Sequence, residues 1–226
     1  MLSIIIPCFN EEEVIENSID KISRFIRNKN IAAELIMVNN ASTDNTLNTL
    51  NNFDNQDNIV ILNQPKKGKG NAVKMGLKNT KYDKILILDA DLSTDINELK
   101  LEWLDFDETV LFGSRYFGDE INTPKIRKVS GNILNLIIRL FFKIQIRDTQ
   151  CGFKFISTER KEEIISKLTV GGFLYDLDLL LASIELGMSV EEVPIKYIFD
   201  ANSSVSLFRD PLLMLFDLLK LKIKYN

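Results

Sequence analysis

Two carboxylates directly follow an apolar segment of this 226-residue chain. Asp89 and Asp91 flank Ala90 immediately after Ile85–Leu88, a run that is typical of a buried strand. Magnesium and manganese ions prefer oxygen ligands and can share them with a diphosphate. We therefore expect Asp89 and Asp91 to bind Mg²⁺ or Mn²⁺. The structural alternative is an acidic turn that caps the following segment.

A basic segment with two glycines, Lys66–Asn71, precedes a helical pattern. The backbone N–H groups of such a loop can approach phosphates at the start of a helix. The spacing of Gly68 and Gly70 fits neither the P-loop nor the dinucleotide-binding fingerprint. A phosphate-binding loop and a solvated turn therefore both remain open.

Further polar side chains stand in two other segments. The run Asn39–Asp44 can supply turn and cap chemistry, or its amides can read a base or a ribose. Asp176 and Asp178 lie in the helical, otherwise apolar segment Phe173–Leu186. Each is either a solvated helix residue or a site carboxylate whose pKa is raised.

Short apolar runs alternate with helical patterns through the first half of the chain, and five of these runs predict strands: Leu2–Ile6, Leu35–Val38, Ile59–Leu62, Ile85–Leu88 and Val110–Phe112. This alternation indicates an α/β fold with a mainly parallel central sheet flanked by helices. In such sheets ligands bind beyond the carboxyl ends of the strands. The polar residues at those ends are Asn10, Glu11, Asn39, Asn40, Asp89, Asp91 and Arg115.

One helical pattern stands between the first two of these strands, and further elements follow the fifth strand. Ile15, Ile19, Ile22 and Ile26 form one apolar helical face, and Asn10 is expected to cap that helix. Later elements are predicted as a strand at Phe153–Ile156, a helix at Phe173–Leu186 and a strand at Val193–Phe199.

Two segments combine apolar and basic residues. Lys125–Arg147 carries six basic residues and no acidic one, and the tail Pro211–Asn226 is apolar and ends in lysines. Amphipathic helices of this kind lie on anionic membranes, or they pack against the sheet. No stretch is long and apolar enough to span a bilayer, so we expect a peripheral contact with a membrane surface.

Composition excludes several classes of site. The chain has no histidine, which excludes a Ser-His-Asp triad, a Cys-His pair and a zinc site with imidazole ligands. Its two cysteines cannot form a disulfide scaffold, and we expect reduced thiols in a cytoplasmic protein. The net charge of −4 gives no support for nucleic-acid binding, and the N-terminus shows no signal-peptide pattern.

Taken together, these segments resemble glycosyltransferase family 2. The matching segments are Ser3–Glu11, Val38–Asp44 and Asp89–Asp91, with Gly113–Arg115, Arg147–Lys154, Phe173–Leu180 and Glu192–Pro194 closer to its polyprenyl-phosphate branch. The resemblance implies one GT-A-type domain over residues 1–226, with a nucleotide-sugar half (1–115), an acceptor half (116–208) and an amphipathic tail (209–226). It also implies inverting transfer of a hexose from a nucleotide-diphospho-sugar to polyprenyl or dolichyl phosphate, at the cytoplasmic face of a membrane.

The resemblance also assigns roles to residues. Pro7, Cys8, Asn10, Glu11 and Asn40 fall at nucleoside-contacting positions, and Lys69 falls near the donor. Asp89 and Asp91 fall at ribose, metal and diphosphate positions, Arg115 and Arg127 face the lipid phosphate, and Asp176 stands where sugar-accepting relatives keep a base. Asn39-Asn40-Ala41 replaces the usual Asp-Asp-Gly, and the Asn40 amide suits the donor and acceptor pattern of uracil, so a UDP-sugar is favoured.

Two other functions remain open from the sequence. A family 2 transferase that acts on a sugar hydroxyl would need Asp176 as its general base. A nucleotide-sugar-binding module without turnover would account for Asn39 and Asn40, although Asp89, Asp91 and Arg115 speak against it.

Overall fold

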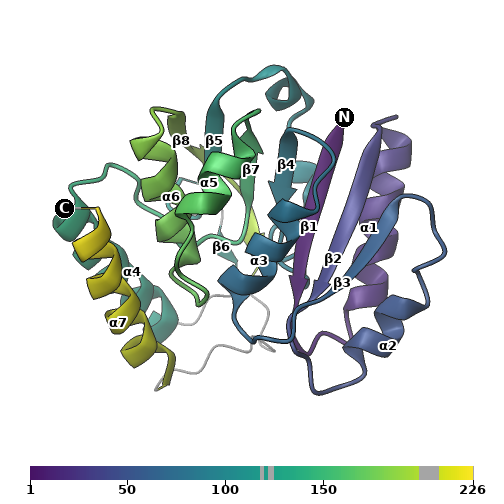
Figure 1. The fold of residues 1–226 in the computed structure, drawn as a ribbon, viewed down its shortest axis with the longest axis horizontal. Coiled ribbons are helices and arrows are strands. Elements are labelled where there is room, and N and C mark those ends of the chain that lie inside the picture. Colours follow the sequence, from purple (N-terminus) through teal and green to yellow (C-terminus); the bar gives the residue numbers. More distant parts are fainter. Residues whose placement is uncertain (118–119, 122–124, 199–208, 226) are drawn as a thin grey trace.

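The computed structural model describes residues 1–117, 120–121, 125–198 and 209–225 of the chain. Side chains at positions 120–121, 125–128, 130 and 209–213 lie outside this description. The described residues form a central sheet with helices on both of its faces (Figure 1). The predicted α/β architecture with a mainly parallel sheet is therefore confirmed.

The main sheet has seven strands in the order β3-β2-β1-β4-β7-β5-β8. They are β1 (Leu2–Cys8), β2 (Ala33–Asn39), β3 (Ile59–Asn63), β4 (Lys84–Ile87), β5 (Thr109–Ser114), β7 (Lys154–Ser157) and β8 (Ser189–Pro194). All pairs are parallel except those of β7, which runs antiparallel to β4 and to β5. A second, two-stranded sheet pairs β6 (Glu120–Ile121) with β9 (Tyr197–Ile198).

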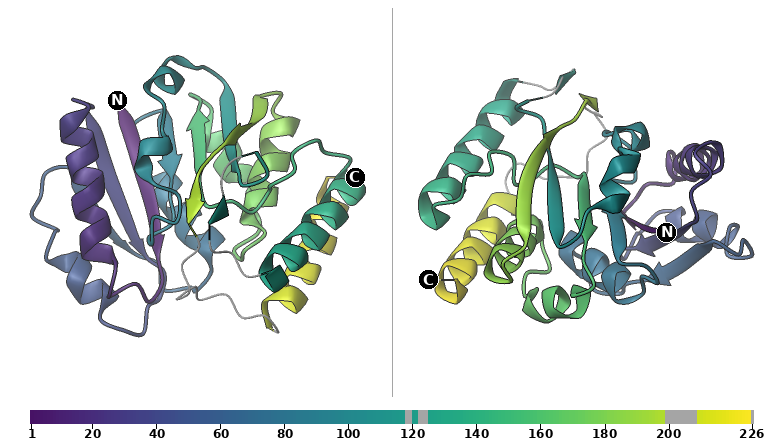
Figure 2. Two further views of the ribbon diagram at one scale, coloured as in Figure 1. Left: turned by 180° about the vertical axis from the view of Figure 1, so that it is seen from behind. Right: turned by 90° about the horizontal axis from the view of Figure 1, so that it is seen from above.

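Helices cover the two faces of the sheet in separate layers. The helical elements are α1 (Ile15–Asn28), α2 (Thr46–Asn51), α3 (Lys69–Lys78), η1 (Ile96–Glu98), η2 (Leu101–Asp105), α4 (Lys125–Phe142), α5 (Lys161–Lys167), α6 (Tyr175–Glu185) and α7 (Arg209–Lys224). Helices α3, α5 and α6 lie on the face turned to the viewer in Figure 1, and α1 lies on the opposite face, as Figure 2 shows.

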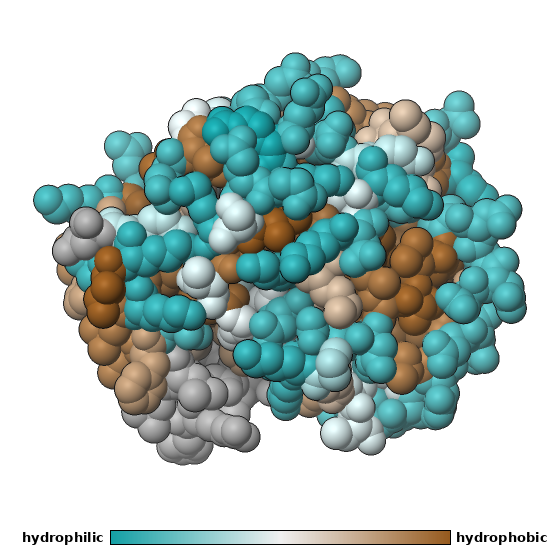
Figure 3. Space-filling model, viewed as in Figure 1, coloured by the Kyte–Doolittle hydropathy of each residue, from teal (hydrophilic) through white to brown (hydrophobic). Residues whose placement is uncertain are grey.

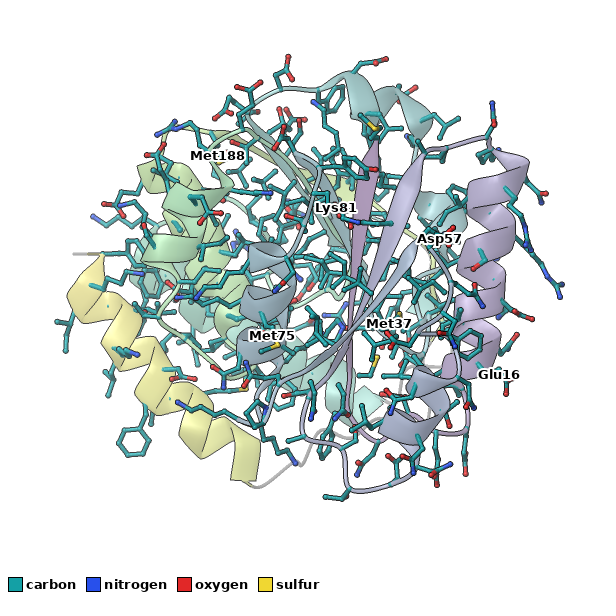
Figure 4. All side chains as sticks on the ribbon, turned by 45° about the vertical axis from the view of Figure 1, so that its right-hand side comes forward. Glu16, Met37, Asp57, Met75, Lys81 and Met188 are labelled. Atoms are coloured by element: carbon teal, nitrogen blue, oxygen red, sulfur yellow. The ribbon has the colours of Figure 1, made fainter. Side chains whose placement is uncertain are left out.

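Alternation along the strands divides the core between these two layers. In β1, Ile5 packs into the cluster beneath α3 and α6, whereas Ile4 and Ile6 pack into the cluster beneath α1. Successive side chains of a strand point to opposite faces, and a sheet covered on both faces therefore requires continuous apolar strands. Figure 4 shows Met37 of β2 inside the molecule and Glu16 on the outer side of α1.

Helices α4 and α7 lie side by side at one end of the sheet (Figures 1 and 2). Both leave large apolar side chains exposed, which are Val129, Ile133, Leu136, Ile137, Leu140 and Phe141 on α4 and Leu215, Phe216, Leu219 and Ile223 on α7. In Figure 3 the exposed apolar surface of α7 runs along the left edge of the molecule. Within the described ranges, no helix has both the length and the apolar character needed to cross a bilayer.

Two boundary predictions are wrong. The strand predicted at Val193–Phe199 is instead the end of β8 and the separate strand β9, which belong to different sheets, and Phe199 lies outside the described residues. The second concerns the start of the first helix. Helix α1 begins at Ile15, and Asn10 does not cap it. Asn10 instead adopts a positive φ of 56° and binds the next loop, since its Oδ1 accepts from the Thr43 N–H at 2.8 Å. The apolar face of α1 is confirmed, because Ile15, Ile19, Ile22 and Ile26 are all buried.

Candidate active site

The carboxyl ends of β1, β2 and β4 meet at one edge of the sheet because these strands are parallel. Asp89 and Asp91 follow β4 at this edge, and the Asn40 N–H donates to the Cys8 carbonyl at 2.7 Å. Strand β7 is antiparallel, so its beginning, rather than its end, lies at the same edge. Gly152 and Lys154 therefore join residues of the first half.

Asp89 is held by a lysine and by a glycine. The Lys69 Nζ lies 2.5 Å from the Asp89 Oδ1, and a Cβ placed on Gly152 would lie 1.9 Å from Oδ2. Burial alone would raise the pKa of Asp89, but the nearby charges of Lys69, Lys154 and Arg115 outweigh it and lower that pKa. Asp89 is therefore an ionised carboxylate in an electropositive setting.

Asp91 has the opposite electrostatic setting. Burial and then repulsion from Asp89 raise the pKa of Asp91, although its Oδ1 accepts the Ser93 N–H at 2.9 Å. The acidic-turn alternative is thus also realised, because this hydrogen bond forms a local turn.

These two carboxylates fit a divalent cation. A cation relieves the repulsion between them, and their hard oxygen atoms match Mg²⁺ or Mn²⁺. Among the residues that the structure describes, no group of three or more acidic or thiol side chains is arranged to hold a metal ion. The remaining ligands of a cation at Asp89 and Asp91 would therefore come from the diphosphate or from water.

The glycine loop, residues 68–71, has a role that the sequence did not predict. Three of its four N–H groups donate within the protein. Gly68 donates to Asn40 Oδ1 at 2.8 Å, Gly70 to the Gly172 carbonyl at 3.2 Å and Asn71 to the Gly171 carbonyl at 3.1 Å. The interpretation of this loop as a backbone phosphate cradle does not fit these contacts. It presents the Lys69 side chain to Asp89 instead.

Asn40 is buried, with 6% exposure, and its Oδ1 accepts from Gly68. This contact links the end of β2 to the glycine loop. The predicted role of Asn40 in base recognition must therefore use the rest of its amide or the second lone pair of this oxygen.

The other predicted nucleoside contacts follow β1. Pro7 and Cys8 are buried, and the Cys8 thiol donates to the Ile6 carbonyl, so the Cys8 side chain faces the core. The Cys8 carbonyl accepts from the Asn40 N–H and from the Ser42 hydroxyl. Asn10 is exposed, and the Glu11 N–H donates to the Thr46 hydroxyl at 2.8 Å. These residues lie around the same strand ends as Asn40.

Arg115 follows β5 and is held in a two-pronged pair with Asp148. Its Nε lies 2.7 Å from Asp148 Oδ2, and its Nη2 lies 2.9 Å from Oδ1. Asp148 is fully buried and accepts as well from the Arg115 backbone N–H, while its own N–H donates to Glu192. Hydrogen bonds from Arg115 outweigh burial and lower the pKa of Asp148. The guanidinium plane is therefore fixed.

Arg127, predicted beside Arg115, lies in the first turn of α4. Its side chain is outside the described residues. Its role toward an acceptor phosphate stays a prediction.

Asp176 is buried in an ion pair with Lys154. The Lys154 Nζ lies 2.5 Å from Asp176 Oδ1, and the two side chains are 0% and 4% exposed. Lys154 also donates to the Cys151 carbonyl. Burial raises the pKa of Asp176, and Lys154 and Lys69 oppose that rise. As placed here, Asp176 is compensated by a buried ammonium group and is not open to solvent.

The sequence offers Asp178 as a solvated helix residue or as a carboxylate with a raised pKa, and both interpretations are wrong. Asp178 is fully buried, and although desolvation raises its pKa, hydrogen bonds from Lys224, Thr169 and Val170 outweigh desolvation and lower that pKa.

Sequence reasoning missed Asp148 and Lys154 as partners of the site. Asp148 and Lys154 lie in the matching segment Arg147–Lys154, so a signal was present, but nothing assigned them to Arg115 and Asp176. Both cysteines are free and buried, and burial raises the pKa of the Cys151 thiol to about 11.

Comparison with known proteins assigns the chain to a family. The Glycosyl transferase family 2 profile matches residues 3–163. The chain is 29% identical to dolichyl-phosphate beta-glucosyltransferase ALG5A of Trichomonas vaginalis over 210 residues, which is 87% of this chain and 65% of that protein. It is 27% identical to dolichyl-phosphate beta-glucosyltransferase of Drosophila melanogaster over 99% of this chain and 75% of that protein. The chain thus spans slightly less than two thirds of the first relative.

A solved structure shares the fold. Glucosyl-3-phosphoglycerate synthase from Mycobacterium tuberculosis, crystallised with Mn²⁺ and UDP-glucose, aligns with a TM-score of 0.68 at 18% identity, over all of this chain and 80% of that one. The likeness confirms the GT-A-type fold. The profile match covers well over half of the chain, and the chain therefore belongs to glycosyl transferase family 2.

Proposed function

We propose that this chain is an inverting hexosyltransferase that moves a sugar from a nucleotide-diphospho-sugar, a UDP-sugar being favoured, to polyprenyl or dolichyl phosphate. In this proposal residues 1–226 are one domain, with donor half 1–115, acceptor half 116–208 and tail 209–226. The names of the relatives and the UDP-glucose in the solved neighbour support the two substrates. The observation that carries the proposal is the Arg115–Asp148 pair, since it fixes a guanidinium close enough to Asp89 to lower the pKa of that carboxyl.

The chemistry follows from the charges of the two substrates. A phosphate oxygen of the acceptor forms the new bond to the anomeric carbon, while the bond to the donor diphosphate breaks and the nucleoside diphosphate leaves with the electron pair. The nucleophile is already anionic near neutral pH and needs no strong general base. A divalent cation at Asp89 and Asp91, when bound, stabilises the charge of the leaving diphosphate.

The side chains of this protein supply the positioning. Arg115 binds the acceptor phosphate through Nη1 and the second N–H of Nη2, because Nε and the other N–H of Nη2 bind Asp148. Its charge offsets the repulsion between two anionic substrates. Lys69 contacts the donor in this proposal, since its ammonium group lies beside Asp89. A hydroxyl acceptor would need Asp176 as a base, but Asp176 is buried in an ion pair with Lys154, which disfavours that acceptor.

A membrane surface completes the proposal. The outer faces of α4 and α7 carry exposed apolar residues, and Arg139, Lys143 and Arg147 are exposed in and after α4. Apolar burial combined with attraction to anionic lipid holds such helices in the interface. Contact of this face with the cytoplasmic side of a membrane would bring the site to its lipid acceptor.

A donor and acceptor matrix tests the proposal. UDP-hexoses and GDP-hexoses are offered with polyprenyl phosphate or with simple sugars, in the presence of Mn²⁺. We expect transfer from a UDP-hexose to polyprenyl phosphate, and stronger inhibition by UDP than by GDP. Transfer to a sugar hydroxyl, or donor binding without any turnover, would contradict the proposed activity.

A further inference from the structure

The buried carboxylate Asp178, in the first turn of α6, joins two segments that are distant in the sequence. Its Oδ2 accepts from the backbone N–H groups of Thr169 and Val170 at 2.5 and 2.8 Å. Its Oδ1 accepts from Lys224 Nζ at 2.8 Å and from the Tyr225 hydroxyl at 3.1 Å. Asp178 is 0% exposed, so each oxygen is committed to one of the two segments.

The first of these segments, residues 169–172, lies directly on the glycine loop. A Cβ on Gly68 would lie 2.2 Å from the Gly171 carbonyl oxygen, and one on Gly70 would lie 2.5 Å from that of Val170. The N–H groups at the start of α3 donate to the carbonyls of Gly171 and Gly172. Two backbones packed this closely move together, because protein interiors transmit displacement rather than absorb it.

The second segment is the C-terminal end of α7. Lys220 Nζ donates to the Thr169 carbonyl at 2.8 Å, and Lys224 also donates to the Lys167 carbonyl. Lys222 points elsewhere and donates to the Phe141 carbonyl of α4 at 2.7 Å. Figure 1 shows α6 between α7 and α3. A continuous set of contacts therefore runs from α7 through Asp178 and residues 169–172 to the glycine loop and Lys69.

We infer that Asp178 is a positioning residue, which transmits the seating of α7 to the glycine loop and so to the Lys69 that faces Asp89. Helix α7 thus contributes to donor binding in addition to its exposed apolar face. The inference rests on the proposed function for the identity of the donor. The contacts themselves require no bound molecule.

Variants at the α7 end test this inference without removing the buried carboxylate. The double variant Lys224→Met, Tyr225→Phe removes both donors to Asp178 Oδ1. The variant Lys224→Arg retains a charged donor. The matched control is Lys222→Met, which also removes one lysine from α7. Hydrogen–deuterium exchange of residues 66–78 is measured in each full-length protein. UDP affinity in the presence of Mn²⁺ is measured by calorimetry.

In the double variant we expect faster exchange at residues 66–78 and about tenfold weaker UDP binding. Donor KM should rise with kcat nearly unchanged, Lys224→Arg should restore most of the affinity, and Lys222→Met should match the wild type. Exchange in the double variant that equals exchange in the wild type and in the Lys222→Met control overturns the inference. If exchange responds but the wild type does not bind UDP, the coupling stands and the proposed donor is wrong.

Discussion

Lys69 Nζ lies 2.5 Å from Asp89 Oδ1, so a side-chain ammonium already neutralises one of the two carboxylates expected to bind a metal ion. Desolvation opposes the charge on Lys69, but attraction from Asp89 and Asp176 raises the pKa of this lysine. A divalent cation arriving alone therefore meets a site with a resident positive charge. A cation that arrives with a diphosphate brings new negative charge for Lys69 to bind.

The first prediction concerns Lys69→Met. Loss of the ammonium should strengthen Mn²⁺ binding in the absence of nucleotide by about tenfold. The repulsion between two unit positive charges about 4 Å apart is on the order of 1–4 kcal/mol in a partly hydrated site. The same change should weaken UDP binding. Electron paramagnetic resonance titration of free Mn²⁺ and calorimetry with UDP measure the two effects. Unchanged Mn²⁺ affinity would show that Lys69 does not compete with the cation.

Asp91→Asn is expected to preserve the fold and to remove nearly all turnover. An amide oxygen can still accept the Ser93 N–H, whereas the negative charge for a cation is lost. The expected loss is about 3–4 kcal/mol of transition-state stabilisation or more, which is a decrease of several hundredfold. Circular dichroism checks the fold, and initial rates check the activity. Near-normal activity, or full activity of the wild type in chelator, would refute the metal assignment.

Variants of the Lys154–Asp176 pair distinguish a structural role of Asp176 from a catalytic one. Asp176→Asn alone leaves the buried Lys154 ammonium uncompensated, and it should destabilise the protein by about 3–5 kcal/mol. The double variant Asp176→Asn, Lys154→Met should recover stability because no unpaired charge remains. With a phosphate acceptor the double variant should keep activity within about tenfold of the wild type. A loss as large as that of Asp91→Asn would instead favour a hydroxyl acceptor with Asp176 as its base.

The link between Asp178 and α7 should depend on pH. Burial raises the pKa of Asp178, but hydrogen bonds from Lys224, Thr169 and Val170 outweigh it and the pKa lies below its usual value of 3.8. The charged and titratable groups that act on Asp178 are Lys74, Asp217, Lys224 and Tyr225. Because the folded pKa is depressed, this stabilisation is present above the unfolded pKa and is lost as pH falls through the folded one.

Lys224→Met should therefore lower the free energy of unfolding by about 1–2 kcal/mol at pH 7. The difference from the wild type should shrink toward zero below about pH 4. Urea titrations at a series of pH values measure it. A difference that stays constant down to pH 3 would contradict the charge-assisted link.

The membrane prediction concerns the outer faces of α4 and α7. Replacing Leu215, Phe216 and Ile223 by serine should reduce binding to anionic vesicles by at least tenfold, because three exposed apolar side chains no longer enter the interface. Wild-type binding should weaken as salt rises. Vesicle flotation measures both effects, with neutral vesicles as the control. A wild-type chain that does not float with anionic vesicles at low salt would refute the prediction.

The sequence predicts the first five strands well, but it merges β8 and β9 into one strand and does not predict the order of the strands in the sheet. Strands β1 to β5 appear where continuous apolar runs stand, because burial on both faces leaves no room for polar residues. Nothing in the run Phe153–Ile156 indicates that β7 enters antiparallel between β4 and β5. Without that placement Lys154 cannot be assigned to the site, and Arg115 cannot be paired with an acid 33 positions away. The helix cap predicted at Asn10 is wrong because asparagine is favoured both at helix N-caps and in left-handed loop positions, so the residue type alone does not distinguish the two.

The position of β7 also bears on the order in which the chain can fold during synthesis. Strands β4 and β5 do not pair with each other. Strand β4 can pair with β1 as soon as it is made, but its second neighbour is β7, and both neighbours of β5, which are β7 and β8, emerge from the ribosome only later. Until then β4 is an open edge that ends in Asp89, and β5 has no neighbour among the strands made before it. A nascent chain that ends near residue 115 would therefore hold an exposed strand edge and be prone to aggregation. Asp89 and Asp91 would gain their fixed geometry late, in the same event that closes the sheet.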